Sequence, residues 1–294
     1  MTTKNIGLLH PGEMGAAVAV TLKNGGHEVW WASGGRGAAT RRRAESAGIK
    51  DAGTIAELCG QCEVLVSVCP PEFAEALAQE TASLGFRGLY VDANAISPKR
   101  AAMIARIMED SGIHFVDASI IGLPPRKRGE SWIYFSGRHA EEAAAHFSAG
   151  PLEAEALAGD IGKASALKMA FAAHTKGIAA LRAAVLGAAS ELGVLRDLER
   201  HWERTGTTMA QVKASVEHVA PKAWRFVAEM REIAATFQAA GMPTGFHEAA
   251  AEIFARLAPF KSAEQVALED AIEQLSYDRR NSDSRGRAHS SRTA

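Results

Sequence analysis

Apolar positions in the first half of the chain form short continuous runs that alternate with longer amphipathic stretches. The runs are rich in β-branched and aromatic residues, which is typical of buried strands, and the stretches between them have helical spacing. The predicted strands are Ile6–Leu9, Glu28–Trp31, Val64–Cys69, Leu89–Asp92, His114–Asp117 and Trp132–Phe135, and the predicted helices lie near residues 14–24, 38–47, 72–84 and 98–111. This alternation predicts a parallel sheet covered by helices on both faces, which is the doubly wound α/β (Rossmann) fold.

The alternation ends near residue 155, and helical spacing continues from there. Residues 160–192 contain no proline and predict a single helix of about 30 residues, roughly 45 Å long. Shorter helices are predicted near residues 195–204, 207–217, 221–239, 245–257 and 264–275. We therefore expect an α/β domain over residues 1–158, an all-helical domain over residues 159–277, and a disordered tail over residues 278–294, which has too few apolar residues to fold.

Charge and cysteine content exclude several classes of protein. The chain has 33 Lys and Arg residues against 34 Asp and Glu residues, so its net charge provides no attraction to nucleic acid. No apolar stretch reaches the ~18 residues that would cross a membrane, and the first residues do not resemble a signal peptide. The three cysteines rule out a disulfide framework, and Cys59 and Cys62 lack the second pair of a zinc site. We expect a cytoplasmic protein without a metal, membrane or nucleic-acid partner.

The first predicted strand leads directly into the segment His10-Pro11-Gly12-Glu13-Met14-Gly15, and a helix follows. A dinucleotide-binding fold carries G-x-G-x-x-G at this place, where the second glycine admits the pyrophosphate and the third lets helix and strand pack closely. Gly12 and Gly15 supply these two, whereas His10 replaces the first glycine. The N–H groups at the helix start would face the pyrophosphate. The predicted cofactor contacts are His10, Pro11, Gly12, Glu13 and Met14; an ordinary strand–turn–helix connection is the alternative.

The end of the second predicted strand indicates which dinucleotide is bound. An NAD-binding fold usually carries Asp or Glu about 20 residues beyond the first glycine, where it holds the ribose 2′-hydroxyl. Residues 32–36 contain no carboxylate, and Ser33 and Arg36 suit a 2′-phosphate, which accepts charge-assisted hydrogen bonds from arginine. NADP is therefore preferred over NAD. For the neighbouring residues Arg41–Arg43 we expect a solvated helix face.

Three further residues lie at the ends of the third and fourth predicted strands. In an open α/β sheet, ligands bind outside the carboxyl ends of the strands. Cys69, Pro70 and Asn94 are therefore predicted to contact the nicotinamide half of the cofactor. The alternative is that they only shape the two strand-to-helix turns.

The long predicted helix carries a candidate for proton transfer. Ser165, Lys168, Ala172 and Thr175 share one face of this helix, and the small neighbours of Lys168 leave space for a ligand, so Thr175 is a candidate substrate contact. Apolar surroundings would lower the pKa of the Lys168 ammonium by desolvation. A lysine of that kind can take a proton from an alcohol or give one to a carbonyl, as hydride transfer requires. The alternative is a lysine that extends into solvent.

Three segments together resemble the β-hydroxyacid dehydrogenase family, which includes 3-hydroxyisobutyrate and 6-phosphogluconate dehydrogenases. They are residues 6–15, the strand end Asp117–Gly122, and the pair Gly159 and Gly162 followed by Lys168. The chain is most similar to a phosphogluconate-dehydrogenase-like branch with its own helical C-terminal domain, over about residues 5–260. The resemblance implies that Lys168 is the general acid/base, and that homodimers form through the long helix and the helical domain. It also places Ser119, Ile120 and Gly122 on the substrate side.

The chain departs from the family pattern where the substrate carboxylate is usually held. Ile121, Gly122 and Leu123 stand in place of Ser-Gly-Gly, and Ala172 stands in place of an asparagine one turn after the lysine. A less polar or differently anchored substrate is therefore expected. Relatives also imply that His247 closes the partner's pocket, with a histidine on the helix surface as the alternative.

These observations lead to one main functional prediction and two alternatives. The main prediction is an NADP-dependent oxidoreductase that interconverts a small hydroxy acid or alcohol with its carbonyl form. One alternative is an NADP(H)-binding sensor with little turnover, which the altered substrate strand motivates. The other is an imine reductase, although imine reductases generally lack the lysine.

Overall fold

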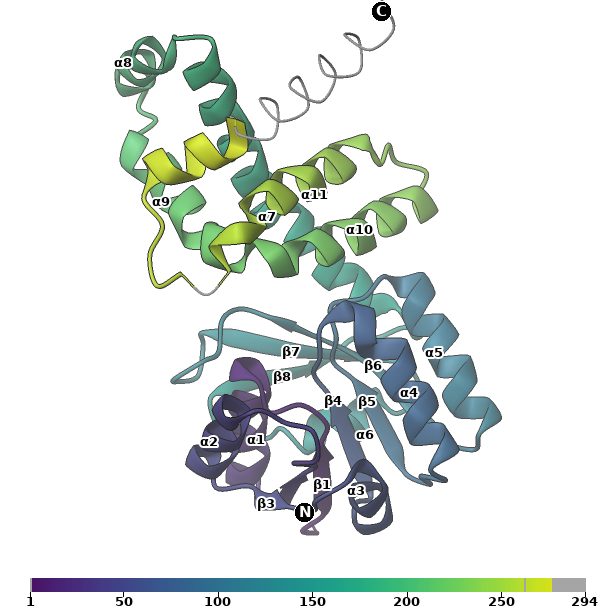
Figure 1. Ribbon diagram of the computed structural model, residues 1–294. Coiled ribbons are helices and arrows are strands. Elements are labelled where there is room, and N and C mark those ends of the chain that lie inside the picture. The colour runs from purple at the N-terminus through teal and green to yellow at the C-terminus, as the bar shows by residue number, and fades with distance from the viewer. Residues whose placement is uncertain (1, 262, 277–294) are drawn as a thin grey trace, which may run out of the picture. The chain divides into compact units, whose positions relative to one another are not determined.

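The computed structural model describes residues 2–261 and 263–276. The chain divides into two compact units, the first ending at Phe171 and the second starting at Ala172 (Figure 1). The units therefore meet within the long helix, after the boundary at residue 158 that the sequence pattern suggested. The predicted disordered tail, residues 278–294, lies outside the described residues.

In the described part of the first unit, eight strands form one sheet in the order β3-β2-β1-β4-β5-β6-β7-β8. The strands β1 to β6 are parallel, β7 is antiparallel to β6, and β8 is parallel to β7. The strands are β1 (Asn5–Leu8), β2 (Glu28–Trp31), β3 (Lys50–Asp51), β4 (Val64–Ser67), β5 (Leu89–Asp92), β6 (His114–Ile121), β7 (Ser131–Ser136) and β8 (Leu152–Ala156).

Helices cover both faces of this sheet. The helices are α1 (Glu13–Asn24), α2 (Ala38–Ala47), α3 (Ile55–Gln61), α4 (Ala74–Ser83), α5 (Pro98–Asp110) and α6 (Ala140–Ala145), and the short 3₁₀ helix η1 (Pro71–Phe73) precedes α4. One core packs α1, α2 and α6 against the sheet, and a second core packs α3, α4 and α5 against its other face. Alternate strand residues, such as Val64 and Leu65, enter opposite cores, which is why the strands read as continuous apolar runs.

The doubly wound fold is confirmed, and the sheet is mostly parallel, as predicted, with β7 as the strand that runs antiparallel to its neighbour β6. The connection between β6 and β7, residues 122–130, is too short for the crossover that a parallel pair needs, so the two strands form an antiparallel pair. Strand β6 also continues to Ile121, beyond its predicted end at Asp117. The elements β3, α3, α6 and β8 were not predicted, because each is too short for its apolar spacing to be recognised.

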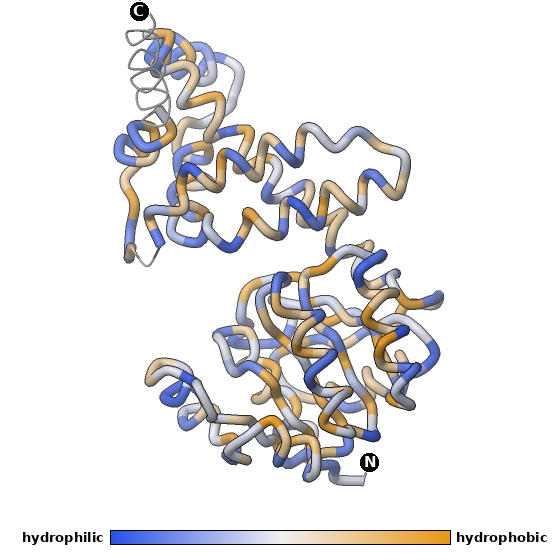
Figure 2. The backbone as a smooth tube through the Cα atoms, turned by 45° about the vertical axis from the view of Figure 1, so that its right-hand side comes forward, coloured by the Kyte–Doolittle hydropathy of each residue, from blue (hydrophilic) through white to orange (hydrophobic). Residues whose placement is uncertain are grey.

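The second unit is helical, as the sequence predicted. Helix α7 (Lys163–Glu191), 29 residues long, begins in the first unit and continues into the second. It is followed by α8 (Leu195–Thr205), α9 (Met209–Val219), η2 (Ala220–Lys222), α10 (Ala223–Ala239), α11 (Gly245–Leu257), η3 (Ala258–Phe260) and a helical stretch at 268–276. Hydrophobic and hydrophilic residues alternate along these helices (Figure 2).

Two interactions fix α10 within this unit. The Nζ atom of Lys176 on α7 lies 2.8 Å from a carboxylate oxygen of Glu229 on α10, and both side chains are largely buried. The rings of Phe226 and Phe254 join α10 to α11, with centroids 5.4 Å apart. No helix within the described residues is long and apolar enough to cross a membrane.

Candidate cofactor and active site

The turn between β1 and α1 has the features of a phosphate-binding site. Gly12 precedes the first residue of α1, and no side chain caps the helix there. A Cβ atom added at Gly12 would have no neighbour within 4 Å, so space is open above the turn. The N–H groups of the first helical turn have no partner within the helix, and together with the helix dipole they attract an anion. Of the two residues that follow, Glu13 is exposed and Met14 packs partly against the core.

Close packing of α1 on β1 requires the glycine at position 15. A Cβ atom there would clash with the backbone carbonyl oxygen of His10. The third glycine of the motif therefore has the role that the sequence predicted, and it fixes the backbone of residue 10 against the helix.

The side chain of His10 contacts Arg36, which comes from the loop after β2. The distance between His10 Nε2 and Arg36 Nη1 is 2.6 Å, although the residues are 26 apart in sequence. Burial, helped by the Arg36 charge, lowers the pKa of His10 to about 4, so the ring is neutral at neutral pH. Ser33 is buried beside this contact, and its hydroxyl is hydrogen-bonded to Asp51. The structure thus brings His10, Ser33 and Arg36 together at one edge of the sheet.

Arg41 and Arg42 are exposed, as predicted for a solvated helix face, but Arg41 and the partly buried Arg43 also donate hydrogen bonds to loop carbonyls. The Arg41 side chain donates to the carbonyl oxygens of Ser33 (2.9 Å) and Arg36 (3.2 Å). Arg43 donates from Nε to the carbonyl oxygen of Pro11, at 3.3 Å. Loop carbonyls outside the sheet need partners, and these two arginines of α2 supply them. They hold the two loops that flank the candidate phosphate sites.

The strand ends of β4 and β5 are joined by Asn94. Its Oδ1 atom accepts from the Cys69 N–H at 2.6 Å, and its Nδ2 atom donates to Ser67 Oγ at 3.0 Å. The side chain of Asn94 is 2% exposed, so its amide has the turn-shaping role that was the alternative to cofactor contact. Burial raises the pKa of the Cys69 thiol to about 12, and Pro70 leads into η1.

A buried carboxylate attaches the start of α7 to the sheet. Asp117, in the middle of β6, accepts hydrogen bonds from Ser136 Oγ (2.8 Å), Gly162 N (2.9 Å), Ser165 N (3.1 Å) and Ser165 Oγ (2.5 Å). Burial raises the pKa of Asp117, and these donors oppose that shift. The backbone of Gly162 has a φ of +98°, a conformation that favours glycine. This explains the glycine at position 162 in the motif formed by Gly159 and Gly162. This role of Asp117 was not predicted, although an acidic residue inside an apolar strand is a signal that the sequence carries.

Lys168 lies about one helical turn after Ser165, at the carboxyl end of β6. Its Nζ atom donates to the carbonyl oxygen of Ile120 at 2.8 Å, and the side chain is half-buried. The alternative of a lysine that extends into solvent therefore does not hold. Ser119 is buried on the same strand, and its Oγ atom has no hydrogen-bond partner among the described residues. Gly122 follows with a φ of +125° and packs against Ser131.

The other two predicted substrate residues belong to the second unit. Thr175 is exposed on α7. His247 is 4% exposed and packs between Phe237 and Phe246, with ring centroids 4.3 Å and 5.2 Å away. Burial lowers its pKa. The alternative of a surface histidine is therefore wrong, and the substrate contacts of both residues stay predictions.

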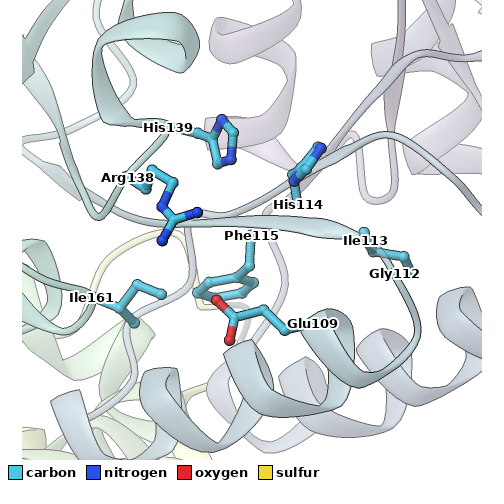
Figure 3. A pocket seen from close by; sticks show the side chains of 8 residues that line it. All are labelled: Glu109, Gly112, Ile113, His114, Phe115, Arg138, His139 and Ile161. Carbon is cyan, nitrogen blue, oxygen red and sulfur yellow. The ribbon is translucent and has the colours of Figure 1, made fainter.

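The remaining candidate positions lie away from this edge of the sheet. Cys59 and Cys62 are buried in the core, which raises the pKa of their thiols to about 11 and about 12 and agrees with a packing role. A pocket of the first unit, which includes His114, Arg138 and His139, is shown in Figure 3. His114 is the first residue of β6, whereas Lys168 contacts the strand near its last residue, so this pocket is not the candidate active site.

The fold and the glycine turn define a dinucleotide-binding protein of the dehydrogenase type. Residues 5–147 match the NAD binding domain of 6-phosphogluconate dehydrogenase, and residues 189–257 match a domain of unknown function, DUF1932. These two matches support the resemblance to a β-hydroxyacid dehydrogenase-like family that the sequence indicated.

Individual relatives agree with this assignment. An uncharacterized 28.5 kDa protein of Methanothermus fervidus is 28% identical over 200 residues, which cover 68% of this chain and 76% of the relative. The structure of conserved protein MTH1747, described as similar to 3-hydroxyacid dehydrogenases, is 29% identical with a TM-score of 0.63, over 87% of this chain and 97% of that chain. A 3-hydroxyisobutyrate dehydrogenase of Salmonella typhimurium shares the fold, with 18% identity and a TM-score of 0.67 over 92% and 99% of the two chains.

We predict that Asp117→Asn lowers the free energy of unfolding by about 3 kcal/mol. The NH₂ group of the asparagine cannot accept a hydrogen bond, so it would face N–H and O–H donors that the carboxylate oxygen now accepts from. Urea denaturation followed by circular dichroism measures the change. Ser136→Ala removes one of the donors and also the acceptor of the Ala164 N–H group, and it should cost about 1–2 kcal/mol. Equal losses from the two substitutions would contradict the central role of the carboxylate.

Proposed function

We propose that the protein is an NADP(H)-dependent oxidoreductase that interconverts a small hydroxy acid or alcohol with its carbonyl form. The observation that carries the proposal is the position of Lys168, whose Nζ atom is held at the carboxyl end of β6 in the unit that contains the dinucleotide turn. A bound nicotinamide cofactor supplies or accepts the hydride, and the protein must move the accompanying proton.

The residues at the sheet edge fit such a cofactor. The open space at Gly12 and the uncapped start of α1 suit the pyrophosphate. Arg36 suits a 2′-phosphate, because it forms no ion pair with a described carboxylate and residues 32–36 are without an acid of their own. Asp51, on the neighbouring strand β3, is hydrogen-bonded to Ser33 and Gly53. These features support NADP over NAD.

Lys168 is the group that we assign to proton transfer. In the reducing direction its ammonium gives a proton to the carbonyl oxygen of the substrate, and in the oxidising direction its neutral amine takes the proton of the alcohol. The hydrogen bond to the Ile120 carbonyl fixes the position of Nζ, so that little ordering is needed when a substrate binds.

The strand end beside Lys168 favours a substrate of low polarity. Ile121 and Leu123 stand in place of the serine and the last glycine of the family's Ser-Gly-Gly, and on α7 Ala172 stands in place of an asparagine. This apolar character also favours a second candidate, the reduction of cyclic imines, whereas Lys168 favours carbonyl compounds. A substrate panel that pairs cyclic imines with the corresponding ketones separates the two reactions.

The helical unit supports the proposal that the protein is a homodimer. Apolar residues recur at alternating spacings of three and four along α7, at Ile178, Leu181, Val185 and Ala188, and the spacing continues to Leu192 directly after the helix; this is the spacing of a coiled-coil seam. Leu181 is 50% exposed and Leu192 is 76% exposed. The next helix, α8, has no buried residue although its apolar side chains share one face. A second copy of the chain would cover both surfaces.

Replacing Lys168 with Met should lower kcat/KM by about 1000-fold, because the proton donor is lost while the apolar stem is kept. NADPH oxidation with a panel of carbonyl compounds measures turnover, and cofactor fluorescence measures binding of NADPH, which should not change. Lys163→Met, at the exposed start of the same helix, is the matched control and should retain activity. Loss of binding together with turnover would show a structural lysine, and binding by the native protein without any turnover would favour the sensor.

Arg36→Ala should weaken NADPH binding by about 10- to 100-fold and leave NADH binding nearly unchanged, because only NADPH carries the 2′-phosphate. A fluorescence titration with each cofactor measures the two dissociation constants. Arg42→Ala, at an exposed position on α2, is the control and should bind both cofactors like the native protein. Equal affinity of the native protein for NADH and NADPH would refute the assignment.

Leu181→Glu should convert the dimer into a monomer of 31.2 kDa, because it places a charge in the proposed seam. Analytical ultracentrifugation of the full chain measures the mass. Ser190→Glu adds the same charge on the opposite side of α7 and should leave the dimer intact. A native protein that sediments as a monomer would remove the proposal.

A further inference from the structure

The histidine that replaces the first glycine of the turn is in direct contact with the candidate phosphate-binding arginine. A guanidinium can only donate hydrogen bonds, so at 2.6 Å from Arg36 Nη1 the His10 Nε2 atom must be the acceptor. The ring is neutral, because burial and the nearby charge lower its pKa to about 4. The proton of the ring therefore lies on Nδ1. His10 thus offers a fixed acceptor to Arg36 without adding a charge.

We propose that His10 is a positioning residue, which holds the Arg36 guanidinium in the orientation that binds the 2′-phosphate of NADP(H). The inference rests on the proposed function and deepens its cofactor assignment. An arginine that moves freely loses rotamer freedom when it binds a phosphate, whereas an arginine that is already held loses much less. The contact would therefore increase affinity for NADPH selectively, since NADH has no 2′-phosphate.

The backbone on both sides of this contact is fixed by other interactions. Gly15 packs against the His10 carbonyl, and Arg43 donates to the Pro11 carbonyl. On the other side, Arg41 donates to the Arg36 carbonyl and to the Ser33 carbonyl. A substitution of the His10 side chain should therefore alter the orientation of the guanidinium and leave both loops in place.

The charge of Arg36 is also available to an anion. Among the described residues no carboxylate forms an ion pair with it, and its Nε atom is buried without a hydrogen-bond partner. The neutral His10 ring directs the guanidinium but does not neutralise it. A bound phosphate would be the anionic partner of the Arg36 guanidinium.

Two substitutions of similar polarity test the inference. In His10→Gln the terminal amide occupies the place of Nε2 and can accept from Arg36, whereas in His10→Asn the amide occupies the place of Nδ1 and does not reach it. We expect His10→Asn to weaken NADPH binding about fivefold with little effect on NADH, and His10→Gln to bind NADPH like the native protein. Fluorescence titration of the full chain measures both cofactors, and adenosine 2′,5′-bisphosphate against 5′-AMP isolates the contribution of the 2′-phosphate.

The outcomes separate this inference from the proposed function. If Arg36→Ala removes the preference for NADPH but His10→Asn keeps it, His10 has no positioning role and only the inference fails. If His10→Asn and His10→Ala weaken NADH and NADPH equally, His10 is a structural residue of the turn, and the inference also fails. If Arg36→Ala leaves the preference unchanged, the cofactor assignment itself fails. Thermal unfolding of each variant verifies that the comparison is made on folded protein.

Discussion

The position of the candidate catalytic lysine depends on one buried carboxylate, that of Asp117. A charge removed from water is unfavourable unless hydrogen bonds surround it, and at this position the donors come from β7 and from the first residues of α7. The start of the long helix is therefore attached to the centre of β6. Because Lys168 lies about one turn further along the helix, its amine arrives at the Ile120 carbonyl, three residues further along the strand. The separation between carboxylate and amine is set by helix and strand geometry.

The opposite side of the site is fixed by packing and by backbone hydrogen bonds. Gly15 allows α1 to lie directly on the carbonyl of His10, and the arginines of α2 attach the loops that follow β1 and β2. Each interaction joins a loop to a regular element, so the candidate phosphate sites have little freedom to move. A cofactor that binds to such a prepared surface needs little reorganisation of the protein, which favours affinity.

The sequence predicts those features of the fold that depend on neighbouring residues alone. The long strands and helices were visible as apolar runs, and the glycines at positions 12 and 15 were visible because the turn itself requires them. The direction of β7 was missed because β6 was predicted to end at Asp117 and not at Ile121, which left a connection long enough for a crossover. The contact of His10 with Arg36 joins residues 26 apart, and the amide of Asn94 turned inward to a neighbouring strand. Contacts of this kind depend on tertiary packing, and no local sequence pattern predicts them.

The side chains at the end of β6 influence which substrates the site can select. At the end of β6 the hydroxyl of Ser119 is buried, and the next side chains that lead to the loop, Ile121 and Leu123, are apolar. The amine of Lys168 lies at this strand end, where it donates to the Ile120 carbonyl. On the proposed function, one amine would then orient the reacting oxygen, and apolar contacts would select the rest of the molecule by shape. Apolar pockets discriminate weakly between substrates that differ by a methylene group, so a site of this kind favours a class of related carbonyl compounds over one substrate.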